Sequence, residues 1–168
     1  MLDAGDVAPS FRATAADGSP ISLDDFRGRP LVLFFYPKAG SPGCTRETEG
    51  FVGAYEALHA AGVALLGVSV DTTSSQARFA VRCQVPFPLV ADHDGSVARS
   101  YDVLGLLGLA RRVTFLLDAD GVVREVIRSP FPRVHVRRAV ARWGPQAPVG
   151  APAPAAPPDD PRAPESGP

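Results

Sequence analysis

The feature that most constrains the fold is an apolar run, Leu31–Tyr36, which lies between Pro30 and Pro37. Its residues are all aliphatic or aromatic, and such side chains pack well on a pleated surface. A short apolar run without alternating polar positions is typical of a strand that is covered on both faces. We therefore expect a buried strand here, with other elements packed on either side of it.

The rest of the chain alternates between strand-like and helical patterns. Turn signals surround a short alternating piece, Phe11–Thr14, which predicts a small hairpin or loop within residues 1–30. An Asp-Gly turn within Asp118–Gly121 separates two β-prone runs and predicts an antiparallel hairpin. The other expected elements are helices at 41–62, 76–85, 96–101 and 132–143 and strands at 63–70, 87–91, 112–117 and 122–127, with a cap cluster at Asp71–Ser75 before the second helix. This order predicts an α/β layered fold.

The loop after the first apolar run delivers a cysteine, Cys44, to the start of a helix. Ser41 is a favoured N-cap residue and Pro42 a favoured first helical residue, so Cys44 falls at the third helical position. A sulfur at that position faces unpaired backbone N–H groups and the positive end of the helix dipole, which favour a thiolate. The pattern indicates a reactive cysteine, and the alternative is a small buried apolar residue.

Composition excludes several classes of protein. The 168 residues carry 17 basic and 18 acidic side chains, so the formal charge is -1 and nothing draws the chain to nucleic acid or anionic lipid. Two cysteines are too few for a secreted disulfide scaffold, and no Cys/His cluster has zinc-ligand spacing, so neither metal nor cofactor is expected. The first residues do not form a signal-peptide pattern, and no apolar run approaches the ~20 residues that span a bilayer. A reducing cytoplasm is the expected compartment.

By composition, the chain divides into a folded domain and a tail. Residues 1–143 are expected to form one domain that closes with a basic amphipathic helix, whose apolar residues are Val134, Val136, Val140 and Trp143. Residues 144–168 are dense in proline and alanine and have no aromatic residue. Such a segment cannot bury enough surface to offset its ordering entropy. We predict a disordered or polyproline-like tail, with a polyproline ligand for a partner domain as the alternative.

One motif resembles a known active site. Pro37, Ser41 and Cys44 match the pattern P-x-x-x-(T/S)-x-x-C of the peroxiredoxins (AhpC/TSA type), with serine where threonine is commoner. The run FYPKAGSPGCTRE is similar to the subgroup called peroxiredoxin Q or bacterioferritin comigratory protein, and the similarity extends in register from about Val7 to Trp143. The resemblance implies a thioredoxin-like fold with a central mixed sheet flanked by helices. It also implies a peroxidase that reduces hydrogen peroxide and organic hydroperoxides, is recycled by thioredoxin or a similar dithiol, and is a monomer or weak homodimer.

Peroxide reduction needs a thiolate and preorganised donors for the departing oxygen. Ser41 Oγ, the backbone N–H groups of Gly43 and Cys44, and one guanidinium would supply them. The resemblance implies that Arg112 provides the guanidinium, because it precedes the run VTFLLD in the family register. Arginine suits this role because it stays charged and offers several donors in a rigid fork. Composition alone is also compatible with a surface arginine beside Arg111.

Glu47 follows Cys44 by almost one helical turn. It could hold Arg112 by a charge-assisted pair, or be an ordinary first-turn glutamate that the helix dipole favours. Tyr36 and Pro37 are expected to wall the pocket. The three histidines are scattered, none is spaced to pair with Cys44, and we interpret them all as structural or surface residues: His59, His93 and His135.

Some members of the subgroup carry a resolving cysteine five residues after the reacting one, but this chain has Glu49 there. The remaining candidate is Cys83, about one turn beyond Ala80, the position that certain relatives use. Cys83 could condense with the sulfenic acid of Cys44, or it could only fill the core. Resolution would require local unfolding of the first helical turn, because a disulfide needs Cα atoms ~4.4–6.8 Å apart. A poorly anchored turn is predicted from Gly40, Pro42 and Gly43.

Two other functions are compatible with the sequence. The chain could be a redox sensor or scaffold that signals through oxidation of Cys44 and docks through its proline-rich tail. It could also be a thioredoxin-fold disulfide reductase. This second alternative lacks the C-x-x-C that such enzymes need, and it has Arg112 where they resemble one another in having a proline.

Overall fold

The computed structural model describes residues 1–145 and contains one seven-stranded sheet in the order β2-β1-β5-β4-β3-β6-β7. β4 (Ala64–Ser69) pairs in parallel with β3 (Leu31–Phe35) and with β5 (Leu89–Ala91), whereas β6 (Val113–Leu117) runs antiparallel to β3. The remaining strands are antiparallel at the two edges: β1 (Arg12–Ala15), β2 (Pro20–Ser22) and β7 (Val123–Arg128). The predicted α/β fold with a mixed sheet is confirmed, including both hairpins.

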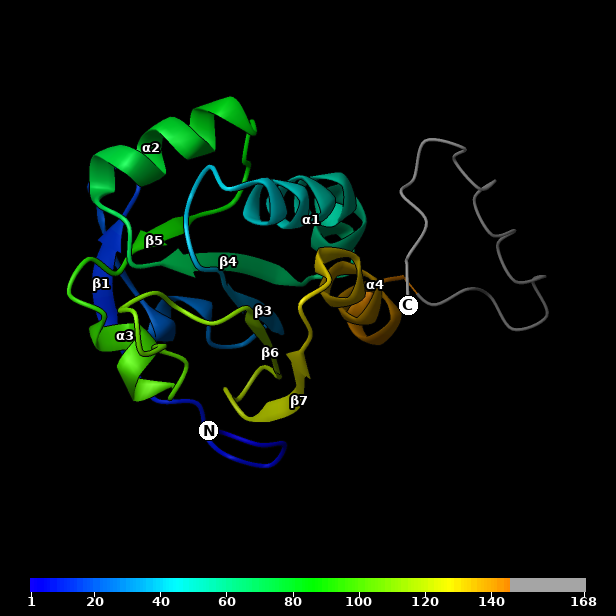
Figure 1. The fold of residues 1–168 in the computed structure, drawn as a ribbon. Helices are drawn as coiled ribbons and strands as arrows, with labels where there is room; N and C mark the ends of the chain where they lie inside the picture. The colour runs from blue at the N-terminus through cyan, green and yellow to red at the C-terminus, as the bar shows by residue number, and fades with distance from the viewer. Residues whose placement is uncertain (146–168) are drawn as a thin grey trace, which may run out of the picture.

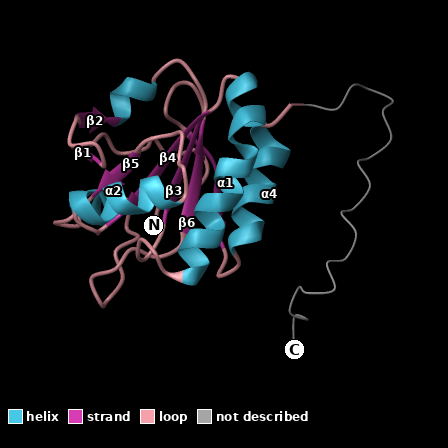
Figure 2. Ribbon diagram, turned by 90° about the horizontal axis from the view of Figure 1, so that it is seen from above, coloured by secondary structure: helices cyan, strands magenta, loops and turns pink. Residues whose placement is uncertain are grey.

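Helices cover both faces of this sheet. Figure 1 shows α1 (Pro42–Ala60) and α2 (Thr73–Arg82) over one face and the short α3 (Ser96–Ser100) on the opposite side. α4 (Pro132–Trp143) packs beside α1, as Figure 2 also shows from above. The two helices approach closely at Gly50, where an added Cβ would lie 2.8 Å from a methyl group of Val136. A 3₁₀ turn, η1 (Leu23–Phe26), leads into β3.

β3 is buried on both faces, as its sequence predicts. Every residue of the strand is buried, and alternate side chains enter two separate apolar clusters. Val32 and Phe34 join the cluster under α1 and α2, which also holds Cys44 and Cys83. Leu33 and Phe35 join the cluster on the opposite face. β3 thus contributes to both layers and ends directly before the loop that carries Cys44.

The inner face of α4 packs against the core through the predicted apolar residues and also contains a buried histidine. The buried residues of this helix are His135 and Ala139, whereas the predicted apolar residues Val134, Val136, Val140 and Trp143 are only partly buried around them. His135, interpreted from the sequence as a structural or surface residue, is fully buried, and its Nδ1 atom lies 3.7 Å from Glu47 Oε1. Apolar periodicity could not find a histidine at the centre of a buried helix face.

Two further predictions concern membrane spans and the C-terminal end of the domain. No helix among residues 1–145 is long and apolar enough to cross a bilayer. α4 ends at Trp143, and all but the first two residues of the predicted tail at 144–168 lie outside the described part of the chain.

Candidate active site

Cys44 lies in the first turn of α1, and its side chain is fully buried. The helix begins at Pro42 after Ser41 at the N-cap, as predicted, so the sulfur is at the third helical position. Ser41 does not cap the helix with its side chain; its hydroxyl instead donates to Lys38 O at 2.9 Å. The N-terminal amides of α1 are therefore not occupied by the serine oxygen.

The loop before α1 is anchored more firmly than its small residues predict. Ala39 N donates to Asp71 Oδ2 at 2.8 Å, and Asp71 Oδ2 also accepts from Ser69 Oγ at 2.6 Å. Thr45 donates to Ser41 O through both its backbone N, at 2.9 Å, and its hydroxyl, at 2.8 Å. The prediction of a poorly anchored turn is therefore wrong, because polar side chains outside the glycine-rich stretch hold it in place.

Arg112 lies directly before β6, and its side chain reaches the sulfur from this neighbouring strand of β3. β6 pairs with β3, the strand that leads to the Cys44 loop, so the two segments meet at one end of the sheet. Arg112 Nη2 donates to Cys44 Sγ at 3.4 Å. Gly43 permits this approach, because a Cβ at that position would lie 3.0 Å from the same Nη2 atom. A guanidinium so close to a sulfur at a helix N-terminus favours negative charge on that sulfur.

Glu47 holds the other arm of the guanidinium. Arg112 Nη1 donates to Glu47 Oε2, and the carboxylate is fully buried whereas the arginine side chain is 14% exposed. Burial raises the pKa of Glu47 to about 7, although the charge of Arg112 opposes this effect. One planar fork therefore bridges a carboxylate and a cysteine sulfur, which a lysine could not do with the same geometry.

Behind Glu47 lies a polar chain that the sequence did not reveal. His135 Nδ1 is 2.8 Å from Thr114 Oγ1 and 3.7 Å from Glu47 Oε1, and His135 Nε2 is 2.8 Å from Ser129 O. Both Thr114 and His135 are fully buried. One sequence signal points to this chain: Thr114 is the polar residue in an otherwise apolar strand, two positions after Arg112.

Two further predicted site residues, Tyr36 and Pro37, directly follow β3. Pro37 is half-buried, and Tyr36 is fully buried at the end of β3. The Tyr36 hydroxyl donates to Gln76 Oε1 at 2.6 Å, and Gln76 Nε2 donates to Val90 O at 2.8 Å. Burial raises the pKa of Tyr36 above its ordinary value. This hydroxyl is therefore fixed to α2 through Gln76, so it holds the sheet and α2 together beside the loop.

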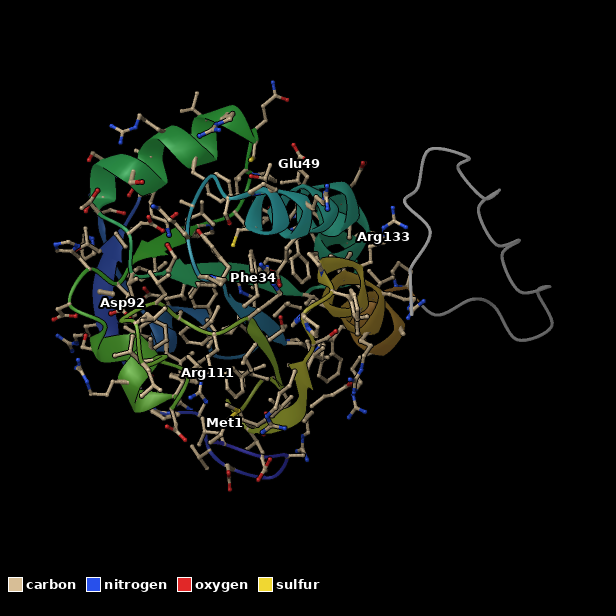
Figure 3. The ribbon with its side chains drawn as sticks, viewed as in Figure 1. Met1, Phe34, Glu49, Asp92, Arg111 and Arg133 are labelled. Atoms are coloured by element: carbon tan, nitrogen blue, oxygen red, sulfur yellow. The ribbon has the colours of Figure 1, made fainter. Side chains whose placement is uncertain are left out.

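Cys83 lies just past the last residue of α2, at its C-cap, and is 7% exposed. Gln84 follows in a left-handed conformation with φ 51°, which ends the helix. Burial raises the pKa of the Cys83 thiol, and the nearby Glu49 carboxylate adds to this effect. In Figure 3, Glu49 projects from the outer side of α1, and Phe34 lies beneath the helix. Both cysteines are free thiols.

The arrangement supplies a sulfur, a guanidinium and a buried acid, without a metal centre in the part of the chain that the structure covers. Within residues 1–145 no group of three or more His, Cys, Asp or Glu side chains could hold a metal ion. The chemistry available here is nucleophilic attack by the sulfur, with the guanidinium placed to stabilise negative charge on the sulfur or on a departing oxygen.

Comparisons with known proteins agree on one family. The family model described as AhpC/TSA matches residues 4–126 of the chain. Among curated proteins, the chain is 36% identical over 148 residues to the putative peroxiredoxin bcp of Coxiella burnetii, covering 83% of this chain and 95% of that protein.

Solved structures show the same fold. Peroxidoxin BcpB from Mycobacterium tuberculosis matches with a TM-score of 0.80 and 35% identity, covering 85% of this chain and 97% of that one. Bacterioferritin comigratory protein from Xanthomonas campestris matches with a TM-score of 0.74 and 31% identity, covering 79% and 89%. That structure is described as giving insights into alkyl peroxide reduction activity. The predicted thioredoxin-like fold is confirmed.

Proposed function

This chain belongs to the AhpC/TSA family of peroxiredoxins, in the bacterioferritin comigratory protein or peroxiredoxin Q subgroup, and on that premise we propose that Cys44 is its peroxide-reducing residue. The peroxidase activity itself follows from family membership. The residues that perform it, the range of peroxides and the route of recycling are the substance of the proposal. Hydrogen peroxide and organic hydroperoxides are the proposed substrates, and the alkyl peroxide activity of the Xanthomonas relative supports the second class.

In the proposed first step the Cys44 thiolate attacks the terminal oxygen of the hydroperoxide. A sulfur–oxygen bond forms as the O–O bond breaks, which leaves a cysteine sulfenic acid and an alkoxide or hydroxide that takes up one proton. Arg112 donates to the sulfur before the reaction and is placed to donate to the oxygen that carries charge as the O–O bond breaks. The backbone N–H groups at the start of α1 are further donors.

The observation that carries this proposal is the fork of Arg112 between Cys44 Sγ and the buried carboxylate of Glu47. A cysteine that only fills a core needs no guanidinium beside it, because a neutral thiol gains little from a partly buried cation, whereas a thiolate gains a charge-assisted hydrogen bond. With Glu47 fixing one arm, the other arm stays aimed at the sulfur. Ser41 and Pro37 complete the proposed site from the loop.

We further propose that Cys83 resolves the sulfenic acid. Its thiolate would attack the Cys44 sulfur, so that a disulfide forms as the sulfur–oxygen bond breaks and the hydroxide takes up a proton and leaves as water, after which thioredoxin or a similar dithiol would reduce the disulfide. Both thiols are free and belong to the same apolar cluster under α1 and α2, which supports this pairing. The cycle suits a reducing compartment such as the cytoplasm and a monomer or weak homodimer, since no second chain is required.

Peroxide consumption by purified variants tests the proposal. Cys44→Ser should consume peroxide at least about 10³-fold more slowly than the unsubstituted protein, because the attacking atom is gone. Cys83→Ser should form the sulfenic acid once but no intramolecular disulfide, as mass mapping after one equivalent of peroxide would show. Turnover of many peroxide molecules per protein with thioredoxin separates an enzyme from a sensor. Peroxide consumption that survives in Cys44→Ser would refute the assignment.

A further inference from the structure

His135 lies behind the ion pair of Arg112 and Glu47, and the proposed reaction does not use it. Its ring is fully buried, with Nε2 near Ser129 O and Nδ1 near Thr114 Oγ1, each at 2.8 Å. A carbonyl oxygen only accepts, so Nε2 carries a proton and donates to Ser129 O. Burial lowers the pKa of His135, which favours the neutral ring. In that ring Nδ1 is an acceptor and takes the hydrogen bond of the Thr114 hydroxyl.

Glu47 Oε1 faces this same nitrogen. The two atoms are 3.7 Å apart, and Oε1 has no hydrogen-bond partner among the residues that the structure describes. With these hydrogen bonds, Glu47 Oε1 and His135 Nδ1 are two acceptors that face each other inside the protein. Buried acceptors without a donor are costly. The Thr114 hydroxyl can rotate and release the lone pair of Nδ1, and a single proton placed between Oε1 and Nδ1 would then pair the carboxylate oxygen.

The charges around the contact favour such a proton. Arg112 is one cation, and it faces both the Glu47 carboxylate and the Cys44 sulfur. When Cys44 is a thiolate, two anions share one guanidinium. Arg138 also faces His135 from α4, but its charge is paired with Glu125 of β7. One added proton behind Glu47 makes the buried cluster of Cys44, Arg112, Glu47 and His135 neutral, which a medium of low dielectric favours.

We propose that Glu47 and His135 share one exchangeable proton that balances the charge of the Cys44 thiolate, and that His135 is thereby a positioning residue for peroxide reduction. The inference rests on the proposed function, because it takes Cys44 as the attacking sulfur. The proton comes from solvent and returns to it as the pH rises. While the proton is present, Glu47 attracts the guanidinium of Arg112 less strongly. The guanidinium then interacts more strongly with the Cys44 thiolate. The pKa of Glu47, raised to about 7 by burial, places this uptake near neutral pH.

The variant His135→Asn tests the proton site. Its amide N–H can donate to Glu47 Oε1 but cannot take up a proton in this range, and a hydrogen bond to the charged form lowers the pKa of the carboxyl and so favours the anionic carboxylate. At pH values below the Glu47 pKa of about 7, we expect the second-order rate constant for peroxide to be about five- to tenfold lower in this variant than in the unsubstituted protein. Above that pH the loss should disappear, since Glu47 of the unsubstituted protein is then also anionic. His93→Asn, at an exposed histidine, is the matched control and should behave as the unsubstituted protein at every pH.

A double-mutant cycle shows whether His135 acts through Glu47. In a Glu47→Gln background the pH-dependent effect of His135→Asn should vanish, because the carboxylate that would share the proton is absent. A loss that is equal at all pH values and persists in that background would mean that His135 only supports the core, and would overturn the inference. So would the absence of any loss. Neither result affects the outcome for Cys44→Ser, so the proposed function is tested separately.

If His135→Asn does not fold, NMR of the histidine rings in the protein with His135 intact tests the same proton site. Nitrogen-15 NMR of the histidine rings should show the proton on Nε2 at high pH and a change at Nδ1 as the pH falls through about 7. In Cys44→Ser this transition should move to lower pH, because the balancing anion is missing. A His135 signal that does not change with pH, or a transition unmoved by Cys44→Ser, would overturn the shared proton.

Discussion

The two cysteines of this protein lie in the same apolar cluster but in opposite electrostatic surroundings. Cys44 lies in the first turn of α1, where backbone N–H groups and the guanidinium of Arg112 favour negative charge on the sulfur. Cys83 lies at the C-cap of α2, at the negative end of a helix dipole and near Glu49. Its thiol has a raised pKa, chiefly because of burial.

Burial alone does not distinguish the two cysteines. Cys44 is fully buried and Cys83 is 7% exposed, so both are within the core. What separates them is which end of a helix each occupies and which charge each faces. The arrangement suits a proposed cycle in which one sulfur attacks peroxide as a thiolate and the other stays a protected thiol until a sulfenic acid forms. Three substitutions test this contrast.

The largest effect is expected from Arg112→Gln, which removes the cation from Cys44 and leaves Cys83 untouched. The rate constant for peroxide should fall about 10²–10³-fold, the usual loss when a preorganised donor to a developing charge is removed. Stopped-flow measurement of sulfenic acid formation gives this rate directly. Arg111→Gln, at the exposed neighbouring arginine, is the control and should have little effect. Equal losses in both variants would mean that general surface charge, rather than the contact at 3.4 Å, distinguishes Cys44.

A smaller effect is expected from Gly43→Ala, which keeps every charged group but moves one. The new Cβ would lie 3.0 Å from Arg112 Nη2, so the guanidinium must shift by a few tenths of an ångström, which disturbs its alignment with the sulfur. We expect a loss of about three- to tenfold in the rate constant for peroxide. Gly53→Ala is the control on the same helix, because its Cβ would meet no atom within 4 Å, and it should stabilise the helix by about 0.5–1 kcal/mol. If Gly43→Ala reacts as fast as Gly53→Ala, the exact position of the guanidinium is unimportant.

Much of the architecture around Cys44 could be predicted because it follows from local chemistry. The apolar run before Pro37, the Ser41-Pro42 start of the helix and the Asp118–Gly121 turn each act within a few residues, and the structure places all three where the sequence predicts. The position of Arg112 beside Cys44 depends instead on the pairing of β6 with β3, which no local pattern encodes. That prediction came from the resemblance to a family rather than from the residues themselves.

The parts that could not be predicted involve polar groups from distant segments. Asp71 holds the loop of Ala39 from the end of β4, and His135 reaches Glu47 from the last helix. Each is an ordinary residue in its own stretch of sequence: an acid in a cap cluster and a histidine in a basic helix. Their importance appears only once the sheet brings the segments together, because a buried hydrogen bond needs geometry that spacing along the chain does not give.

The smallest effect is expected from Glu49→Gln, which changes the surroundings of Cys83 alone. Glu49 is exposed on α1 and raises the pKa of the Cys83 thiol, in addition to the larger effect of burial. Removing its charge should lower that pKa and increase the fraction of Cys83 thiolate at neutral pH. Because a thiol becomes less nucleophilic as its pKa falls, the net gain in disulfide formation should be only about twofold. Rapid quenching with a thiol-alkylating reagent, followed by mass spectrometry, measures the rate of disulfide formation after one equivalent of peroxide.

The pH dependence of the same step distinguishes this explanation from a change in the first reaction. A thiol with a raised pKa is mostly protonated at neutral pH, so disulfide formation should become faster as the pH rises, until the pH passes the pKa of Cys83. Glu49→Gln should move this rise to lower pH and leave sulfenic acid formation at Cys44 unchanged. Glu56→Gln, at another exposed glutamate of α1, should move neither. Disulfide formation that is independent of pH would show that opening of the first turn of α1, rather than ionisation of Cys83, limits resolution.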